Sequence, residues 1–175
     1  MGTKRLDRIS QRDKHGQLRA VLESPQGSRH KLKYVPEEGL FKISSTFPAG
    51  MSMPFDFGFF PRTLAPDGDP LDVLVLMDGP AHPGVTAAVH LLGVIEAEQS
   101  EDGGKPFRND RLIAVALGST ERGDLRRLSD LDEVLLTQIE AFFETYDRLT
   151  RKTFKPLGRK GPRVAQKLLD DATRK

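Results

Sequence analysis

The segment "DGDPLDVLVLM", residues 67–77, joins a turn rich in carboxylates to an apolar run. Glycine and proline in its first half predict a turn, because they favour the backbone angles that turns require. The second half, residues 72–77, has few polar residues and predicts a strand that is buried on both faces. Asp67, Asp69 and Asp72 therefore gather where a turn leads into a buried strand.

These three carboxylates have two interpretations. Bringing anions together is unfavourable unless they share a proton or bind a cation, and a turn before a strand can aim Asp67 and Asp72 into one small volume. Oxygen ligands suit Mg²⁺, Mn²⁺ or Ca²⁺ rather than zinc. In the other interpretation, the acidic side chains only cap the backbone of the turn, and the hexapeptide alone favours this simpler one. An EF-hand fits poorly, since Asp72 stands where that loop requires glycine and no flanking helices are predicted.

The segments around the motif predict a chain of short strands followed by helices. Residues 47–70 are rich in Pro, Gly and Phe, and we expect them to be irregular and held by aromatic packing, with the phenylalanines in the core. A turn at "PEEG" predicts a hairpin between two of the strands. The expected strands are residues 17–23, 29–34, 40–44, 72–77, 85–98 and 111–117.

The helices are expected late in the chain. Ser129 is a plausible N-cap for a helix over residues 130–149. Its apolar face is predicted to hold Leu135, Ile139, Phe142, Tyr146 and Leu149. Pro162 predicts the start of a short final helix. This order favours antiparallel pairing and a barrel flanked by helices over βαβ winding.

Composition limits the class of protein. The length of 175 residues suits one domain, and we expect residues 1–16 to form a flexible arm and residues 17–175 the domain. The absence of cysteine excludes disulfides, thiolate metal sites and cysteine nucleophiles, and it fits a cytoplasmic protein. No apolar run approaches the roughly 20 residues of a membrane span, and the polar start shows no secretory signal. The net charge of +2 does not by itself imply a polyanionic partner.

A basic stretch near the end of the chain has two interpretations. Eight Lys and Arg residues fall between Arg148 and Lys167, with no acidic residue. The favoured interpretation is a solvated surface leading into the last helix. The alternative is a basic wall for a phosphate-bearing ligand or a nucleic acid.

Other catalytic arrangements find no support. The four histidines are scattered, glycine-rich nucleotide loops are absent, and no Ser-His-Asp triad can be assembled. Lys31 alone is most simply a solvated lysine. Arg111, next to Asp110, is most simply one partner of an ion pair at a strand end.

Several segments together resemble a known family. The pieces "ESPQGSRHK", "GLFK", the D-G-D-P-x-D-V-L-V pattern, "NDRLIAVAL" and "IEAFFETY" occur in the order of the soluble family I inorganic pyrophosphatases. The resemblance spans Val21 to Tyr146 and implies a mixed β/α fold, mainly β, with an OB-like five-stranded twisted barrel and flanking C-terminal helices. It also implies hydrolysis of pyrophosphate with several Mg²⁺ ions per site, or Mn²⁺ instead, in a homo-oligomer that is a hexamer or a dimer.

The resemblance also implies roles for individual residues. Asp67 and Asp72 would hold the metal pair that activates water, and Asp69 would take or orient the water proton. Glu23 would bind a further metal through water. Asp110 and Asp102 are candidates for the remaining metal carboxylates, with Glu101 as an alternative to Asp102. Phosphate would be bound by Lys31, Tyr146 and Arg111.

The chain departs from the family pattern at six positions, one of which is Arg111 in place of a Lys. Ser45 stands where a phosphate-binding Arg is usual, Lys33 where a Glu is usual, and Phe57 where a Tyr is usual. Asn109 replaces an expected metal carboxylate, and strand alternation directs Asp110 to the opposite side. Asp147 replaces a Lys, for which Arg148, Lys152 or Lys155 are possible substitutes.

These departures leave several functions open. We expect the chain to be a divergent but active pyrophosphatase. One alternative is a hydrolase of another phosphoanhydride, and the other is a non-catalytic scaffold that binds metal and phosphate. A nucleic-acid-binding barrel is disfavoured, because the aromatic residues do not alternate with basic ones.

Overall fold

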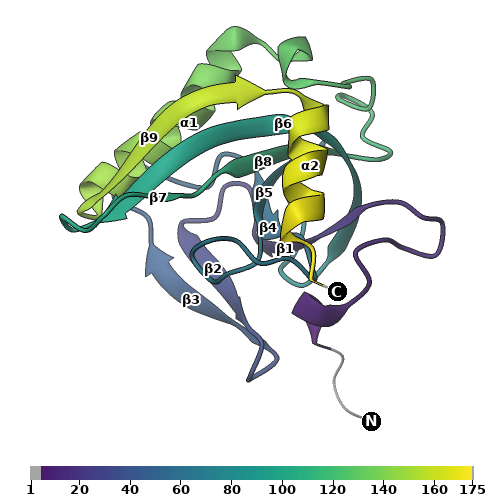
Figure 1. Ribbon diagram of the computed structural model, residues 1–175, viewed down its shortest axis with the longest axis horizontal. Helices are drawn as coiled ribbons and strands as arrows, with labels where there is room; N and C mark the ends of the chain where they lie inside the picture. The colour runs from purple at the N-terminus through teal and green to yellow at the C-terminus, as the bar shows by residue number, and fades with distance from the viewer. Residues whose placement is uncertain (1–4, 175) are drawn as a thin grey trace.

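In the computed structural model, which describes residues 5–174, five strands close into a barrel (Figure 1). They follow the order β1, β4, β5, β8, β6, and β6 pairs again with β1. All neighbours are antiparallel except β5 and β8, which are parallel. The bounds are β1 Arg19–Ser24, β4 Asp56–Phe59, β5 Asp72–Leu76, β6 Thr86–Glu101 and β8 Arg111–Ala116. The predicted mainly β fold with an OB-like barrel and flanking helices is confirmed.

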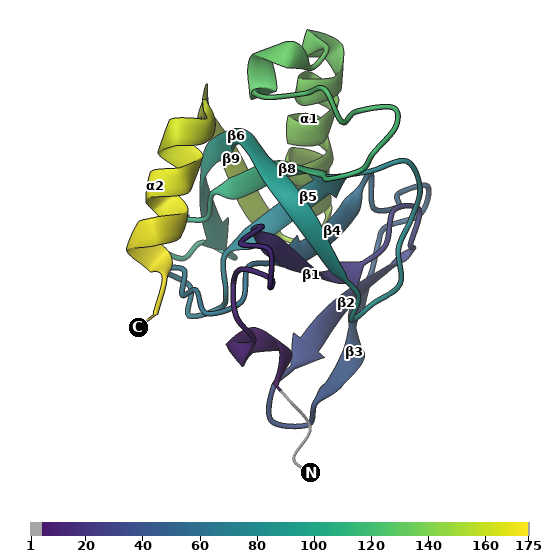
Figure 2. The same cartoon turned by 90° about the vertical axis from the view of Figure 1, so that its right-hand side faces the viewer.

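The predicted hairpin is confirmed and lies apart from the barrel sheet. It consists of β2 (His30–Val35) and β3 (Leu40–Thr46), which pair in a separate two-stranded sheet. Lys31 lies opposite Ser45, and Lys33 lies opposite Lys42. Figure 2 shows the hairpin beside the barrel, on the side away from helix α2.

Strand β6 is long enough to extend beyond the barrel. Its far end pairs with the two-residue strand β7 (Phe107–Arg108) and with β9 (Lys152–Lys160). The sequence analysis did not predict that part of the basic stretch forms a strand, β9, although the basic side chains of β9 are solvent-accessible, as expected. Phe154 is its buried anchor, and the basic side chains around it are exposed or half-buried, which gave the sequence little strand signal.

Helix α1 (Glu133–Leu149) starts later than predicted. Its N-cap is Asp132, whose side chain accepts a hydrogen bond from the Val134 amide, whereas Ser129 lies in the short 3₁₀ helix η2 (Leu128–Asp130). The buried face is rotated relative to the predicted one. It holds Leu136, Ile139, Phe143 and Asp147, while Leu149 is exposed.

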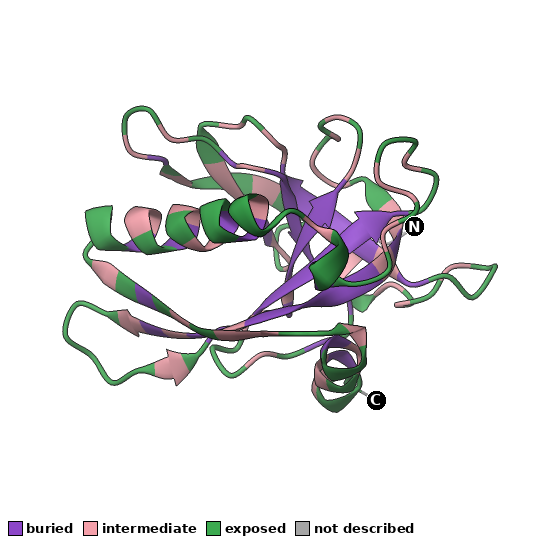
Figure 3. Cartoon of the chain, turned by 90° about the horizontal axis from the view of Figure 1, so that it is seen from above, coloured by how far each residue is buried: buried purple, intermediate pink, exposed green. Residues whose placement is uncertain are grey.

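Helix α2 (Pro162–Ala172) begins at its proline, as predicted. It covers a different side of the barrel from α1 (Figure 2). Strand β5 is buried on both faces, and its two faces contribute to the apolar clusters under the two helices. Val73 and Val75 belong to the apolar cluster under α2, and Leu74 and Leu76 to the cluster under α1. Figure 3 shows buried strands between helices whose outer faces are exposed.

The segment of residues 47–70 is less irregular than predicted, because it contains β4. The sequence did not predict this strand, because a glycine such as Gly58 is unusual inside a strand. Gly58 passes so close to β1 that a Cβ atom would lie 1.9 Å from the Val21 carbonyl oxygen. Only glycine permits this approach. The nearby phenylalanines Phe55, Phe57, Phe59 and Phe60 are all buried, as predicted.

The described part of the N-terminal segment contacts the hairpin. It contains the 3₁₀ helix η1 (Leu6–Arg8), and the Leu6 amide donates a hydrogen bond to the Tyr34 hydroxyl at 3.1 Å. The division into an arm of residues 1–16 and a domain of residues 17–175 stays a prediction, and residues 1–4 lie outside the described part. Among residues 5–174, no helix is both long enough and apolar enough to cross a bilayer.

Candidate active site

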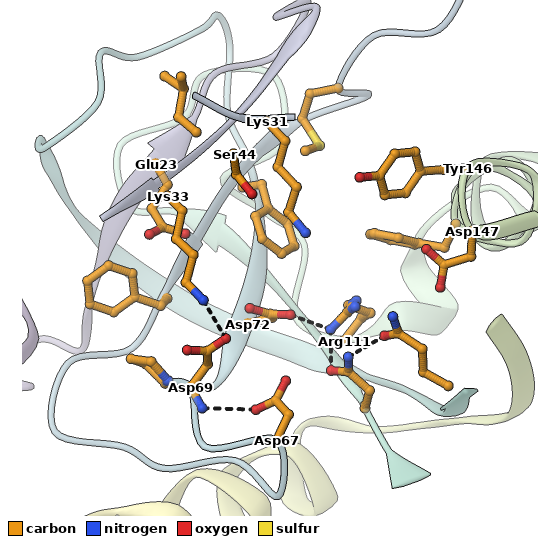
Figure 4. A pocket seen from close by; sticks show the side chains of 18 of the residues that line it. Glu23, Lys31, Lys33, Ser44, Asp67, Asp69, Asp72, Arg111, Tyr146 and Asp147 are labelled. Carbon is orange, nitrogen blue, oxygen red and sulfur yellow. Dashed lines mark hydrogen bonds and ion pairs between the residues drawn. The ribbon is translucent and has the colours of Figure 1, made fainter. Parts of the chain in front are cut away.

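A pocket of about 390 Å³ lies where the hairpin, the DGDPLD turn and helix α1 meet the barrel (Figure 4). The turn brings the motif carboxylates to one wall, and β2 brings Lys31 to the facing wall and Lys33 to the carboxylates. The charged residues that line the pocket are Asp7, Glu23, Lys31, Lys33, Asp67, Asp69, Asp72, Glu101, Arg111, Asp147 and Lys152.

The three motif carboxylates have different partners. Asp67 Oδ1 accepts a hydrogen bond from the Asp69 amide at 3.0 Å, which is the backbone-capping role of a turn aspartate. Asp69 is paired with Lys33, whose Nζ lies 2.7 Å from Oδ2. Asp72 accepts a hydrogen bond from the Arg111 guanidinium. The two sequence interpretations are therefore compatible, because Asp67 caps the turn and also lines the pocket.

Arg111 is a buried cation at the base of the carboxylate wall. Its NH1 group donates to Asp72 and to Asn109 Oδ1 at 2.5 Å. Its guanidinium carbon lies 5.2 Å from the ring centre of Phe143, with two further aromatic rings within 6.0 Å. The two hydrogen bonds from NH1 and the surrounding aromatic rings fix the charge in place.

Glu23 reaches the pocket from β1 and is 8% exposed. One of its oxygens accepts a hydrogen bond from the Tyr34 amide at 2.7 Å. Burial raises the pKa of Glu23 to about 7, and the charge of Asp72 adds to the rise, while the Tyr34 hydrogen bond and the charges of Lys31 and Lys33 oppose it. A nearby cation would favour the ionised form of this carboxyl.

Asp67 and Lys33, at the same wall, both have raised pKa values. Desolvation raises the pKa of Asp67, and the charges of Asp72 and Asp69 raise it further, against the hydrogen bond from the Asp69 amide. Burial tends to lower the pKa of Lys33, but its hydrogen bond to Asp69 and the charges of Asp69, Glu23 and Asp67 outweigh burial and raise it. The Lys33 ammonium is therefore charged at neutral pH and faces three carboxylates.

The opposite wall carries groups suited to phosphate. Lys31 Nζ lies 6.0 Å from the ring centre of Tyr146. The Tyr146 hydroxyl lies 3.1 Å from the Ser45 hydroxyl. A lysine ammonium and a phenol both donate hydrogen bonds, and donors of this kind bind phosphate oxygens.

Asp147 is an acid on the same side of the pocket as Lys31 and Tyr146. It is buried in the last turn of α1, and its Oδ2 atom has no hydrogen-bond partner among the described residues. Burial raises the pKa of Asp147, although the charges of Arg111, Lys31 and Lys152 oppose the rise. The family resemblance identified Asp147 as a replacement for a Lys, but only the fold reveals that its side chain is buried.

Most of the predicted site residues meet in this pocket, and two do not. Asp67, Asp69, Asp72, Glu23, Lys31, Tyr146 and Arg111 all line it. Asp110 faces away, as alternation predicts: its carboxylate accepts hydrogen bonds from Arg108 and from the Ala97 amide. Asp102 lies in the turn after β6 and does not line the pocket. Its neighbour Glu101 does, paired with Lys152 at 2.6 Å.

The carboxylates of the pocket are ligands suited to hard cations, although they do not converge on one point. Glu23, Asp67 and Asp72 offer only carboxylate oxygens, which suit Mg²⁺ or Mn²⁺. Within residues 5–174, no three acidic or histidine side chains lie close enough together to hold an ion as they stand. The pairs of Asp69 with Lys33 and of Asp72 with Arg111 occupy two of the carboxylates instead.

The sequence reasoning missed two contributions to the pocket. Lys33 had been noted only as a departure from the family pattern, although strand alternation puts it on the same face as Lys31 and could have indicated its position. Asn109 had been noted as a lost ligand, but its amide group donates a hydrogen bond to the buried Gln99. No sequence signal connects Asn109, which lies between β7 and β8, with Gln99 on β6.

Comparisons with known proteins agree with this geometry. A profile of the family described as inorganic pyrophosphatase matches residues 20–175. The inorganic pyrophosphatase of Synechocystis is 30% identical over 169 residues, 97% of each chain. That of Halalkalibacterium halodurans is 35% identical over 154 residues, 88% of this chain and 91% of the relative.

A solved structure agrees in fold as well as in sequence. The crystal structure of the inorganic pyrophosphatase from Thermus thermophilus matches with a TM-score of 0.86 and 31% identity, covering 96% of each chain. The motif resemblance, the family profile and the fold lead to the same result. This chain belongs to the inorganic pyrophosphatase family.

Proposed function

We propose that the chain hydrolyses inorganic pyrophosphate to two phosphates, with water as the nucleophile and Mg²⁺ as the metal. The observation that carries the proposal is the two-sided pocket, in which motif carboxylates face Lys31 and Tyr146. A volume of about 390 Å³ accommodates a ligand as small as pyrophosphate.

On the carboxylate side, Asp67 and Asp72 would hold metal ions directly, and Glu23 would hold a further one through water. Such ions, when bound, lower the pKa of water and neutralise the charge on the phosphates. Mn²⁺ is the alternative ion, because it accepts the same oxygen ligands. Asp72 must release Arg111 to bind an ion on its Oδ2 atom. For the remaining ligands, the pocket lining supports Glu101 rather than Asp102 or Asp110.

Asp69 would act on the attacking water. The water oxygen forms a bond to one phosphorus, the bridging P–O bond breaks, and the water proton passes to the Asp69 carboxylate. A positioned carboxylate of this kind contributes by general base catalysis. Lys33 stabilises the ionised form of Asp69 through the hydrogen bond between them.

The phosphate side would bind the leaving group. Lys31 and Tyr146 donate hydrogen bonds to the departing phosphate, on which negative charge develops as the bridging bond breaks. Arg111 sits between the two sides, and its charge, fixed by the surrounding rings, contributes to the positive potential at the pocket base. Asp147 opposes this potential whenever it is ionised.

The deciding experiment is phosphate release from pyrophosphate with Mg²⁺, measured for the wild type and for Asp72→Asn. We expect release by the wild type and a loss of at least about a hundredfold in the variant. Release by the wild type no faster than by Asp72→Asn would overturn the proposal.

A second candidate is a scaffold that binds metal and phosphate without turnover. It is favoured by the two ion pairs that occupy Asp69 and Asp72 and by the acid at position 147. Calorimetry that detects pyrophosphate binding, together with no phosphate release, would establish this candidate. Tripolyphosphate in the release assay tests the third possibility, another phosphoanhydride.

We also propose that the protein is a cytoplasmic homo-oligomer, a hexamer or a dimer, as the family resemblance implies. Light scattering coupled to size-exclusion chromatography tests the assembly, and a mass matching a monomer at micromolar concentration would refute it.

A further inference from the structure

Lys33 places its positive charge among carboxylates that would otherwise attract a metal ion. Its Nζ atom lies 2.7 Å from Asp69 Oδ2, and Figure 4 shows the ammonium entering the carboxylate wall from β2. The charges of Glu23 and Asp67 act on the same ammonium. A positive charge tethered to the chain therefore stands among three carboxylates.

Arg111 is the second tethered charge, but it is held differently. Its guanidinium is buried, surrounded by phenylalanine rings, and hydrogen-bonded to Asp72 and Asn109. Lys33 has no such enclosure, since about half of its side chain is exposed. The Lys33 ammonium therefore stands at the carboxylates without an enclosure that ties it to the core.

We propose that Lys33 substitutes for one divalent ion at the Glu23 and Asp69 side of the pocket, so that this chain binds one ion fewer than its carboxylates would otherwise hold. The inference rests on the proposed role of those carboxylates in metal binding. A tethered ammonium lowers the negative potential that attracts a metal ion, and it is present at every metal concentration.

The arrangement of the pocket agrees with this substitution. No three acids among the described residues converge as they stand, and the ammonium and the guanidinium are each paired with one of the motif carboxylates. A half-exposed lysine–carboxylate pair contributes little to the stability of a fold. Replacement of Lys33 is therefore expected to change metal binding without unfolding the chain.

The test is metal binding by the full chain, measured by calorimetry with Mg²⁺ and with Mn²⁺ in the absence of phosphate. Lys33→Met removes the charge, and Lys33→Glu adds a carboxylate in its place. We expect Lys33→Met to bind the ions about tenfold more tightly than the wild type. We expect Lys33→Glu to bind one additional ion per chain.

Lys42 provides the matched control, because it lies opposite Lys33 in the hairpin and is paired with Glu38 instead. Lys42→Met and Lys42→Glu change the net charge equally and should leave the number of bound ions unchanged and the affinity within about twofold. Thermal unfolding of each variant checks that the fold persists.

Two outcomes separate the inference from the function on which it rests. If Asp72→Asn abolishes metal binding but the Lys33 variants match the wild type in number and affinity, Lys33 has no role in metal binding and the inference fails alone. If Asp72→Asn binds ions like the wild type, the carboxylate wall is not the metal site, and the proposed function and the inference fail together.

Discussion

The hydroxyls of Ser45 and Tyr146 lie 3.1 Å apart, although 101 positions separate the two residues in the chain. The contact joins the hairpin to helix α1 on the phosphate side of the pocket. Where the family pattern has an arginine, this chain therefore has a neutral hydrogen bond between two hydroxyls. Neutral hydroxyls hold phosphate less strongly than a guanidinium does, so we expect the substitution to weaken phosphate binding at the proposed site.

Restoring the positive charge should strengthen substrate binding. We expect Ser45→Arg to lower the KM for pyrophosphate by about tenfold, because one charge-assisted hydrogen bond is worth roughly 1.5–3 kcal/mol. Steady-state kinetics at saturating Mg²⁺ measures the effect. Ser45→Ala is the control, since it removes the contact with Tyr146 without adding charge, and a similar fall in KM for Ser45→Ala would attribute the effect to the freed tyrosine.

Removing the proposed general base should reduce turnover rather than binding. We expect Asp69→Asn to lower kcat by about 10²–10⁴-fold, the usual contribution of a positioned acid or base. The matched control is Asp7→Asn, which also alters a pocket carboxylate, but one that is paired with Arg5. Equal losses in the two variants would contradict a specific role for Asp69.

Asp147 should make the folded chain less stable as pH rises. Burial raises the folded-state pKa of Asp147 above its ordinary value of 3.8, so the folded chain holds this proton more tightly than the unfolded chain. Stability is then lost as pH rises from about 4 through the raised pKa. We expect Asp147→Asn to be more stable than the wild type at pH 8, with a higher urea concentration at the midpoint of unfolding, because the variant leaves no ionised carboxyl buried.

The gain from Asp147→Asn should disappear toward pH 4, where the wild-type carboxyl is protonated in both states. Glu144→Gln, an exposed change on the same helix, should show no comparable gain at either pH. A gain of equal size at both pH values would show that ionisation of Asp147 is not its cause.

Glu23 should produce a similar pH dependence over a different range. Its pKa is raised from 4.5 to about 7, so the free energy of unfolding of the metal-free protein should fall as pH rises between these values. Glu23→Gln keeps an oxygen for the Tyr34 amide and does not titrate. Its stability relative to the wild type should increase by roughly 2–3 kcal/mol between pH 5 and pH 8.

Denaturant unfolding in the presence of a chelator measures this change for Glu23→Gln. Glu37→Gln is the control, because Glu37 is exposed on the same hairpin side of the molecule. Parallel stability curves for the wild type and Glu23→Gln would exclude Glu23 as the titrating group.

Patterns within one segment predicted much of the fold. The apolar run of residues 72–77 predicted β5 and its burial on both faces, and Pro162 predicted the start of α2. Strand β4 was missed because its evidence lies in another strand: the need for glycine at position 58 comes from the carbonyl of Val21. Strand β9 was missed because it has one buried residue, Phe154, among solvated basic ones.

In the site, too, local features were predicted and contacts between distant segments were not. The motif carboxylates were predicted because their spacing is local, and alternation correctly directed Asp110 away from Asn109. The partners of those carboxylates could not be predicted from the sequence, because Lys33 reaches Asp69 across 36 positions and Arg111 reaches Asp72 across 39. Such pairs follow from how the barrel closes rather than from any local pattern.

The length of β6 has a consequence for how the chain folds. This strand of 16 residues pairs with β1 from the first part of the chain and with β9 from the last part. During synthesis, the edge that β9 covers stays open until about residue 160 has emerged, and an open strand edge can pair with another chain. The protein is therefore most prone to aggregate as a nascent chain that lacks β9, and truncation before residue 152 should yield insoluble material rather than a smaller barrel.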